Sequence, residues 1–348
     1  MIPEFDIYVY DKNLNFIGII DFFSSLRWRR KYYDYGEFEL HIPINDQTKK
    51  FLAKDNIIIR EDAIEAGIIE SIKISDDSKK VEATVIGRFL SSILTRRIVK
   101  KRINFSGKIL DGERKVLSEM TPFSKLEIKT TAIESNSIVF QCTYKNVGDY
   151  LLKLSKTSTI AHRIIPDLKR KKYIYENYQG LDRTETQSTN PRYEFSEDKG
   201  NIEKADYTYD SKSEKNFALV GGQGEGDARI LVEVSSGNYS DFDLRETFVD
   251  AKSESNSGLT TSQYNEVLKT KGKENLSDPV ESMEVTAYAT DYKTGWDLGD
   301  IVNTKKESWG KSLKKRIVEI EETIENSNQK IYATFGDPLA ETFSEKED

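Results

Sequence analysis

Cysteine and histidine are almost missing from this chain of 348 residues, which holds one cysteine and two histidines. The single cysteine, Cys142, excludes an intramolecular disulfide and fits a protein that folds in a reducing cytoplasm. Zinc sites and Ser-His-Asp or Cys-His nucleophile systems need paired or cooperating Cys and His side chains. His41, His162 and Cys142 each lie in strand-like runs, so we expect three structural side chains. The sequence therefore predicts no enzyme activity, no catalytic residue, no metal site and no cofactor.

Long apolar runs are also missing, and positive charge does not dominate. No stretch approaches the roughly 20 apolar residues that a membrane-spanning helix needs, and Met1–Asp6 lacks the basic and apolar regions of a signal peptide. The net charge is −7, whereas nucleic-acid binders normally carry a basic domain. The basic run 169–172 is interpreted as a solvated turn. We therefore expect no membrane segment, no signal peptide and no nucleic-acid partner.

Two other patterns are compatible with a catalytic or ligand site but favour a purely structural interpretation. The glycine-rich run 221–226 lacks the Lys-Ser/Thr of a phosphate loop and is followed by strand-like sequence, so it predicts a β-hairpin. Acidic residues number 59, and Asp182, Asp241 and Asp243 are examples of carboxylates that could be nominated for glycoside hydrolysis. Asp241 and Asp243, like the pair 76–77, could also bind Ca²⁺ weakly. Nothing in the sequence distinguishes these carboxylates from solvated surface charge.

What the chain does contain is a series of short runs in which apolar and polar residues alternate, which is typical of strands. The 18 Tyr and 16 Phe can supply cores and broad interfaces. The predicted strands cover 5–10, 16–20, 25–32, 38–42, 57–59, 67–70, 80–85, 138–142, 162–165, 173–175, 206–210, 217–220, 228–234, 283–289, 300–303, 315–324 and 330–335.

The first hundred residues and the last fifty contain a similar β-module. Each copy has an Asp-led apolar run, a first strand, a polar stretch and a second strand that ends at a glycine. The early copy comprises 55–59, 67–70 and 80–87, and the late copy comprises 300–302, 316–319 and 330–336. A duplicated module is typical of ring-like or repetitive assemblies. The alternative is that two ordinary hairpins resemble each other by chance.

Changes of periodicity divide the chain. Helical spacing is found at 88–98, 109–120, 146–154 and 261–271. The predicted fold is mainly β, with an α+β insertion that projects from a β-core built by both chain ends. The predicted units are a first β-domain at 1–99, the inserted domain at 100–190, a second β-domain with one helix at 191–340, and a flexible acidic tail at 341–348.

Seven short motifs follow one another in order along the chain. They are Leu26-Arg27-Trp28-Arg29-Arg30 with Gly36-Glu37-Phe38-Glu39-Leu40; Tyr175-x-x-Tyr178-x-Gly180-x-Asp182-Arg183-Thr184; Gly200-Asn201-Ile202; Asn216-x-Ala218-x-Val220-x-Gly222-x-Gly224-Glu225-Gly226; Arg245-Glu246-x-Phe248-Val249-Asp250-Ala251; Gly295-Trp296-Asp297-Leu298-Gly299-Asp300-x-Val302; and Thr334-Phe335-Gly336. Their order and spacing resemble, over nearly the full length, phage tail baseplate hub proteins of the siphovirus Gp37-like and Gp27-like type.

The resemblance implies two related tail-tube-like β-barrel domains per chain and a homotrimer that presents a pseudo-sixfold ring to the hexameric tail tube. It implies as partners the chain itself, the tail tube protein, a spike or distal fibre protein, baseplate wedge proteins and the tape measure protein. Such a hub is assembled in the bacterial host cytoplasm and released by lysis, within a phage or a phage-tail-like bacteriocin. The sequence leaves open whether the tail is contractile.

Two functions from other classes remain as alternatives to a structural hub. One is a cell-wall polysaccharide hydrolase that uses acidic residues, and the other is a glycan-binding tail protein that uses exposed Tyr and Trp. The hydrolase has no recognisable catalytic constellation in the sequence, and the glycan-binding alternative lacks the signal peptide of a secreted adhesin, although tail proteins leave the cell by lysis and need none.

Overall fold

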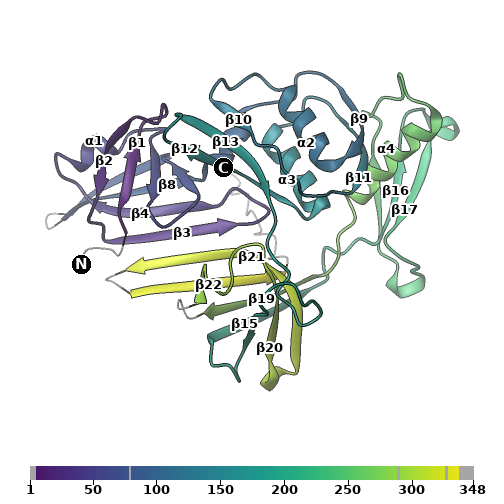
Figure 1. Cartoon of the computed structure of the whole chain (residues 1–348). Helices are drawn as coiled ribbons and strands as arrows, with labels where there is room; N and C mark the ends of the chain where they lie inside the picture. Colours follow the sequence, from purple (N-terminus) through teal and green to yellow (C-terminus); the bar gives the residue numbers. More distant parts are fainter. Residues whose placement is uncertain (1–4, 78–79, 288–290, 326–327, 337–348) are drawn as a thin grey trace.

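The computed structural model of the chain describes residues 5–77, 80–287, 291–325 and 328–336. Strands dominate these residues, and the longer helices gather beside the sheets (Figure 1). The predicted mainly-β fold class is therefore confirmed. The predicted tail at 341–348 lies outside the described residues.

The N-terminal part consists of two sheets packed face to face. Its elements are β1 (Ile7–Tyr10), β2 (Phe16–Ile20), β3 (Ser25–Lys31), β4 (Glu37–Pro43), α1 (Thr48–Phe51), β5 (Ile57–Arg60), β6 (Ala66–Ile68), β7 (Ser71–Asp77), β8 (Lys80–Arg88) and the 3₁₀-helix η1 (Leu90–Arg96). One sheet has the order β2-β1-β5-β6, and β3-β4-β8-β7 belong to a second, larger sheet. Because successive side chains of a strand point to opposite faces, β3 buries Leu26 and Trp28 in a core that also holds Ile7 and Ile58.

The inserted part combines two helices with two small sheets. Its elements are β9 (Ile103–Lys108), α2 (Ile109–Ser118), β10 (Leu126–Ile128), β11 (Ser137–Cys142), α3 (Val147–Ser158), β12 (Ala161–Asp167) and β13 (Lys172–Tyr178). Asn146 caps α3, since its side chain accepts a hydrogen bond from the Asp149 amide at 3.2 Å. Leu151 and Tyr175 share one hydrophobic core with Ile57 of β5, so the insertion packs directly on the N-terminal part.

The C-terminal part forms another β-layer around a cluster of aromatic side chains. Its elements are β14 (Glu194–Ser196), β15 (Ile202–Asp210), β19 (Val280–Ala287), β20 (Ile301–Lys306), the 3₁₀-helix η5 (Glu307–Trp309), β21 (Lys311–Glu325) and β22 (Asn328–Gly336). The Trp296 ring lies 5.1 Å from the Phe195 ring, which lies 4.9 Å from the Phe335 ring. These fully buried rings anchor the core of this part.

A small sheet with one helix interrupts the C-terminal part between β15 and β19. Its elements are β16 (Phe217–Gly221), the 3₁₀-helix η2 (Gly226–Ala228), β17 (Leu231–Ser235), the 3₁₀-helix η3 (Asp241–Asp243), β18 (Glu246–Asp250) and α4 (Thr261–Lys273). Thr260 and Gln263 form a reciprocal capping box at the start of α4. The helix also touches the insertion, where the Thr270 hydroxyl donates to the Val139 carbonyl at 2.6 Å.

The two chain ends meet in one large sheet. Its main path runs β15-β19-β22-β21-β3-β4-β8-β7, so that β21 near the C-terminus pairs with β3 near the N-terminus, as Figure 1 shows. The late predicted hairpin is present as β21–β22, whereas the early one is shifted along the chain, because β8 pairs with β7, which occupies the predicted polar stretch. In the early copy the chain first pairs 66–68 with β5 as β6, and the hairpin with β8 begins only at Ser71.

Two details differ from the sequence predictions. The predicted β-barrels are open, and no sheet closes on itself within the described ranges. The reason is that the two layers of the N-terminal part meet through side chains, with the isolated bridge Gly67–Phe89 joining β6 to the start of η1.

The helix predicted at 88–98 is a 3₁₀-helix over Leu90–Arg96, whereas α2, α3 and α4 are found where helices were predicted. The strand predicted at 283–289 ends at Ala287, and 288–289 lie outside the described residues.

Candidate assembly site

The seam between β21 and β3 joins the N-terminal and C-terminal parts through both backbone and side chains. Arg29 of β3 donates through Nε to Glu321 of β21 at 2.6 Å, and it lies 3.3 Å from Glu319 and 3.2 Å from Glu37. Although burial alone would lower the pKa of Arg29, these carboxylates raise it above its ordinary value. The seam is therefore a fixed joint with paired charges.

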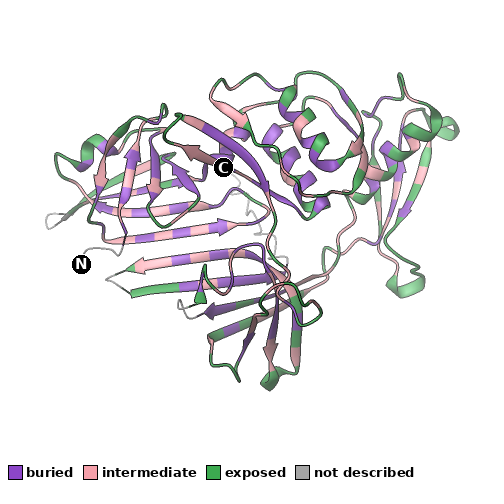
Figure 2. Cartoon of the chain, in the orientation of Figure 1, coloured by how far each residue is buried: buried purple, intermediate pink, exposed green. Residues whose placement is uncertain are grey.

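One face of the large sheet is polar across β15, β19, β22, β21, β3 and β4, and at β8 the same face exposes Ile86 beside Glu39. Side chains of β3 and β4 alternate between buried and half-buried, and the half-buried positions lie opposite the hydrophobic core (Figure 2). Both signs of charge are mixed on this face. It carries Arg27, Arg29, Lys31, Glu37, Glu39, Lys204, Asp206, Glu284, Glu319, Glu321 and Lys330. Such a face suits contact with water rather than with an apolar partner.

The two ends of the large sheet are open strand edges. β7 pairs only with β8, and β15 pairs in the sheet only with β19, among the residues that the structure describes. An edge strand presents unpaired backbone N–H and C=O groups that can add a strand from another chain. The sheet can therefore extend in both directions.

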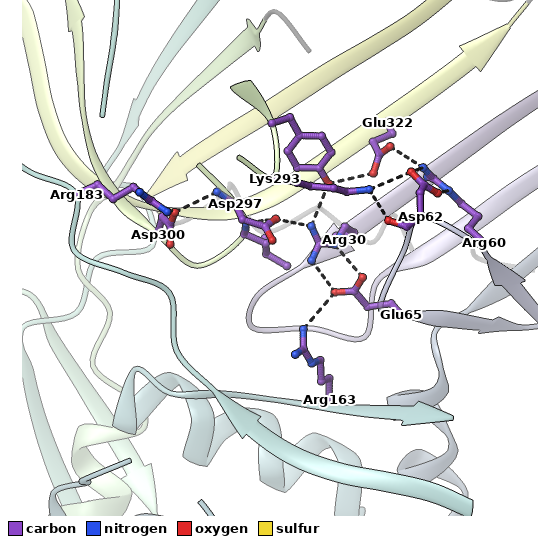
Figure 3. Close-up of polar contacts among 12 residues, drawn as sticks. Arg30, Arg60, Asp62, Glu65, Arg163, Arg183, Lys293, Asp297, Asp300 and Glu322 are labelled. Atoms are coloured by element: carbon purple, nitrogen blue, oxygen red, sulfur yellow. Dashed lines mark hydrogen bonds and ion pairs between the residues drawn. The ribbon is translucent and has the colours of Figure 1, made fainter. Parts of the chain in front are cut away.

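A buried network of charges lies beneath the seam, where three parts of the chain meet (Figure 3). Arg30 of β3 donates to both carboxylate oxygens of Glu65 at 2.8 and 2.9 Å, to Asp297 at 2.5 Å and to the Tyr292 hydroxyl at 3.0 Å. Burial would raise the pKa of Glu65, yet the guanidinium of Arg30 holds that pKa below its usual value. Arg163 of the insertion lies 3.9 Å from the same carboxylate.

A second branch of the network links β5 to β21. Arg60, which is fully buried, lies 2.9 Å from Glu322 and 2.7 Å from Asp62. Tyr292 donates its hydroxyl hydrogen to Glu322 at 3.0 Å, and Lys293 pairs with Asp62 at 3.0 Å. Since buried charges are tolerated only when they are paired and hydrogen-bonded, this network specifies how the parts are oriented.

Two motifs that are 117 residues apart in the sequence also meet at this junction. Arg183 donates to Asp300 at 2.5 Å, and the Leu181 amide donates to the same carboxylate at 2.7 Å. A Cβ on Gly180 would lie 2.0 Å from the carbonyl carbon of Gly299. The close approach of two backbones therefore requires glycine at position 180.

The two histidines and the cysteine lie on strands, as the sequence predicts. His41 lies on β4 beside Glu39 at 2.9 Å. His162 is buried, and burial lowers its pKa to about 4. Its Nδ1 lies 2.8 Å from Ser155 Oγ, which lies 3.5 Å from Glu113. The serine thus stands between the histidine and the acid, in a site closed to solvent, which is not the order that activates a serine nucleophile.

Cys142 and Glu113 are two further buried titratable groups of the insertion. Burial raises the pKa of Cys142 to about 12, which keeps this thiol protonated and unreactive. Burial also raises the pKa of Glu113 to about 7. The Tyr175 hydroxyl and the Asn177 amide donate to Glu113 at 2.8 and 2.6 Å, so this carboxyl group is an internal hydrogen-bond centre.

The other residues considered as possible site residues in the sequence do not come together in one site. The predicted glycine-rich hairpin is present between β16 and β17, and Arg229 fills it by donating to the carbonyls of Gly221 and Gly222. Asp182 accepts hydrogen bonds from Thr184. No group of three potential metal ligands occurs among the described residues. Within the same residues, no helix is both long and apolar enough to cross a membrane.

The buried network of Arg30, Arg60, Glu65 and Glu322 was not predicted from the sequence. One signal was available for it, because Arg30 follows Leu26 and Trp28 at a core-facing position of β3. A charged residue in the apolar register of a strand predicts a buried ion pair, but it does not identify the partner.

Comparisons with known proteins agree on the class of fold. A family model described as "Siphovirus ReqiPepy6 Gp37-like protein" matches residues 6–103 and 110–337. The tail protein from Neisseria meningitidis MC58 has a similar structure, with TM-score 0.61 and 13% identity over 96% of each chain. The 43 kDa tail protein of prophage MuSo2 from Shewanella oneidensis gives TM-score 0.58 at 14% identity, over 95% of this chain and 98% of that one.

A third similar structure is prophage tail protein gp18 from Listeria monocytogenes EGD-e. It gives TM-score 0.56 at 14% identity and covers 96% of this chain and 94% of that one. The search of curated proteins found no match. The fold is thus that of phage tail proteins from several bacteria.

Proposed function

The chain belongs to the family of Siphovirus ReqiPepy6 Gp37-like proteins, and we propose that it is the structural hub of a phage tail tip or of a related tail-like particle. Three copies close a ring that adapts the sixfold tail tube to a central spike or fibre. The observation that supports this proposal is the repeated strand order within the large sheet.

The large sheet is built from two runs of four strands with matching connectivity. The path β15-β19-β22-β21 is followed by β3-β4-β8-β7, and in each run the last two strands are paired as a hairpin. The C-terminal run joins the N-terminal run head to tail, through β21 and β3. We propose that each run of four strands forms the sheet of one ring module, and that the two modules lie within 1–99 and 191–340.

The same head-to-tail joint can operate between chains. The free edge of β7 ends one copy of the path, and the free edge of β15 begins it. If β7 of one chain pairs with β15 of the next, a threefold rotation closes the ring, and six similar modules surround the axis. The polar face of the sheet would then line an aqueous channel that a tape measure segment or DNA can pass.

Six modules around a threefold axis suit a hub between two symmetries. One side of the ring would contact the hexameric tube protein, and the other would hold a trimeric spike or fibre, with wedge proteins at the periphery. Assembly would take place in the cytoplasm of a bacterial host. The hydrolase alternative lacks comparable support, because the cavity beside η1 has only one carboxylate, that of Asp55, among its described lining residues.

Cross-linking in the assembled tail tests the proposed joint. Cysteine is placed at Lys73 of β7 and, in separate variants, at Lys204, Asp206 or Thr208 of β15, so that several registers are sampled. Oxidation should give covalent trimers for one register, while a matched pair of Lys73→Cys with Lys269→Cys on α4 should give none. The absence of cross-links in all three registers, in tails that contain the protein, would contradict the joint.

A further inference from the structure

Among the residues that the structure describes, the small sheet β17-β16-β18 is covered on one face only. The covered face packs against α4 through Ala218, Val220, Val234, Tyr264 and Leu268. On the opposite face Leu231 and Phe248 are 55% and 54% exposed. Leu219 of the central strand lies opposite Phe248 on β18, and Leu231 of β17, which lies opposite Gly221, is diagonally across from Leu219, so the three side chains form a diagonal apolar strip. Apolar side chains that lie together on an exposed sheet face form a candidate interaction surface.

Carboxylates border this strip on both edge strands. Glu233 lies opposite Leu219 on one side, and Glu246 lies opposite Phe217 on the other. Both side chains are exposed, and neither carboxylate has an ion pair to another residue that the structure describes, while the Lys215 ammonium donates to the backbone carbonyl of Glu246 at 3.1 Å. The strip therefore combines apolar surface with unpaired negative charge.

The chain itself shows which chemistry this face accepts. Arg229 lies over Gly221 on the same face, where its guanidinium donates to Asp250 at 2.5 Å. The same guanidinium is 5.3 Å from the centre of the Phe248 ring. An aromatic ring beside a carboxylate thus already holds one cation, through a charge-assisted hydrogen bond and a cation–π contact.

An aromatic ring beside carboxylates is also found at the end of the sheet, where no ion pair to a described cationic side chain is present. Phe242 is 94% exposed and stands between Asp241 and Asp243 in the β17–β18 connection. Buried Asn216 fixes this connection, because its amide donates to the Asp243 carbonyl at 2.7 Å and accepts from the Arg245 amide at 2.8 Å. The exposed ring is therefore presented from an anchored loop.

We propose that the outer face of this sheet, formed by Leu219, Leu231, Glu233, Glu246 and Phe248, docks a basic and apolar segment of another tail protein. Apolar side chains of the segment would cover the strip, and its Lys or Arg side chains would pair with Glu233 and Glu246. This proposal does not depend on the threefold ring, because the small sheet lies outside the path of the large sheet.

Three synthetic peptides of six residues test both components of the proposal on the whole protein. One alternates Leu with Lys, the second alternates Leu with Glu, and the third alternates Ser with Lys. Binding is measured by fluorescence anisotropy at two salt concentrations. The Leu-Lys peptide should bind, and added salt should weaken its binding. The other two should bind at least about tenfold more weakly, which corresponds to about 1.4 kcal/mol.

Paired substitutions locate the binding on the small sheet. The variant Leu231→Thr/Phe248→Thr should lose binding of the Leu-Lys peptide by about tenfold or more, and its unchanged melting temperature would show that the sheet still folds. Phe16→Thr, which removes a comparably exposed ring from β2, should bind like the wild type. Equal binding of the Leu-Lys and Ser-Lys peptides, or unchanged binding by the paired variant, would overturn the proposal.

Discussion

The guanidinium of Arg60 lies 2.9 Å from the carboxylate of Glu322, although the two residues are 262 positions apart in the sequence. Both side chains are almost inaccessible to water, with 0% and 1% exposure. The pair connects β5 of the N-terminal part to β21 of the C-terminal part. Because a buried charge must stay paired, this ion pair fixes the orientation of the two sheet runs relative to each other.

Removal of one partner of this pair should destabilise the protein strongly. We expect Arg60→Leu to lower the free energy of unfolding by roughly 3 to 5 kcal/mol, because Glu322 is left buried without its cation. The double variant Arg60→Leu/Glu322→Leu should recover part of that loss. Urea unfolding measures both. The exposed pair Lys269–Glu266 is the control, and Glu266→Gln should cost less than about 1 kcal/mol.

Glu113 should make stability fall as the pH rises. Burial raises its pKa from an ordinary 4.5 to about 7, so between these values the folded state holds a proton that the unfolded state has released, and raising the pH favours unfolding. Relative to the wild type, Glu113→Gln should gain about 3 kcal/mol between pH 4.5 and 8. Urea unfolding across this range measures the difference, and a constant difference would contradict the raised pKa.

His162 should act in the opposite direction at lower pH. Burial lowers its pKa from 6.5 to about 4, so between these values the unfolded state binds the proton, and stability rises with pH. Between about pH 4.5 and 6.5 the contributions of Glu113 and His162 therefore oppose each other. His162→Phe, which can keep the stacking on Tyr175, should lose the rising component, as thermal melts in this range would show.

Gly180→Ala should disrupt the junction between the motifs at 180–183 and 297–300. The new methyl group would lie 2.2 Å from the Gly299 carbonyl oxygen and 2.3 Å from the Asp300 amide nitrogen, and backbone atoms cannot turn aside as a side chain can. We expect a loss of about 3 kcal/mol in the free energy of unfolding. Gly107→Ala meets only the edge of the Phe105 ring at 3.1 Å and should cost much less.

The local structure of this protein could be predicted from the sequence better than the contacts between its parts. Alternation along β3 and β4 and the spacing of α2, α3 and α4 are local properties, so they could be predicted from neighbouring residues. The pairing of β21 with β3 depends on contacts nearly 300 residues apart, and no local pattern specifies it. Arg60 and Glu322 could not be matched for the same reason, because several carboxylates are equally plausible partners for one arginine.

The open barrels have a related explanation. A strand pattern shows which face of a strand is buried, but it does not show whether the last strand of a sheet finds a partner. The edges of β7 and β15 are unpaired in the described part of a single chain. We propose that neighbouring copies in the ring supply the partners of these edges.

Three-dimensional imaging of assembled tail tips tests this account most directly. The account predicts a ring of three copies in which β7 of each chain lies beside β15 of the next, with six similar sheet runs around a channel lined by the polar face of the sheet. A map that places the protein on the outside of the tail, or that leaves β7 and β15 exposed in a ring closed by other elements, would contradict it.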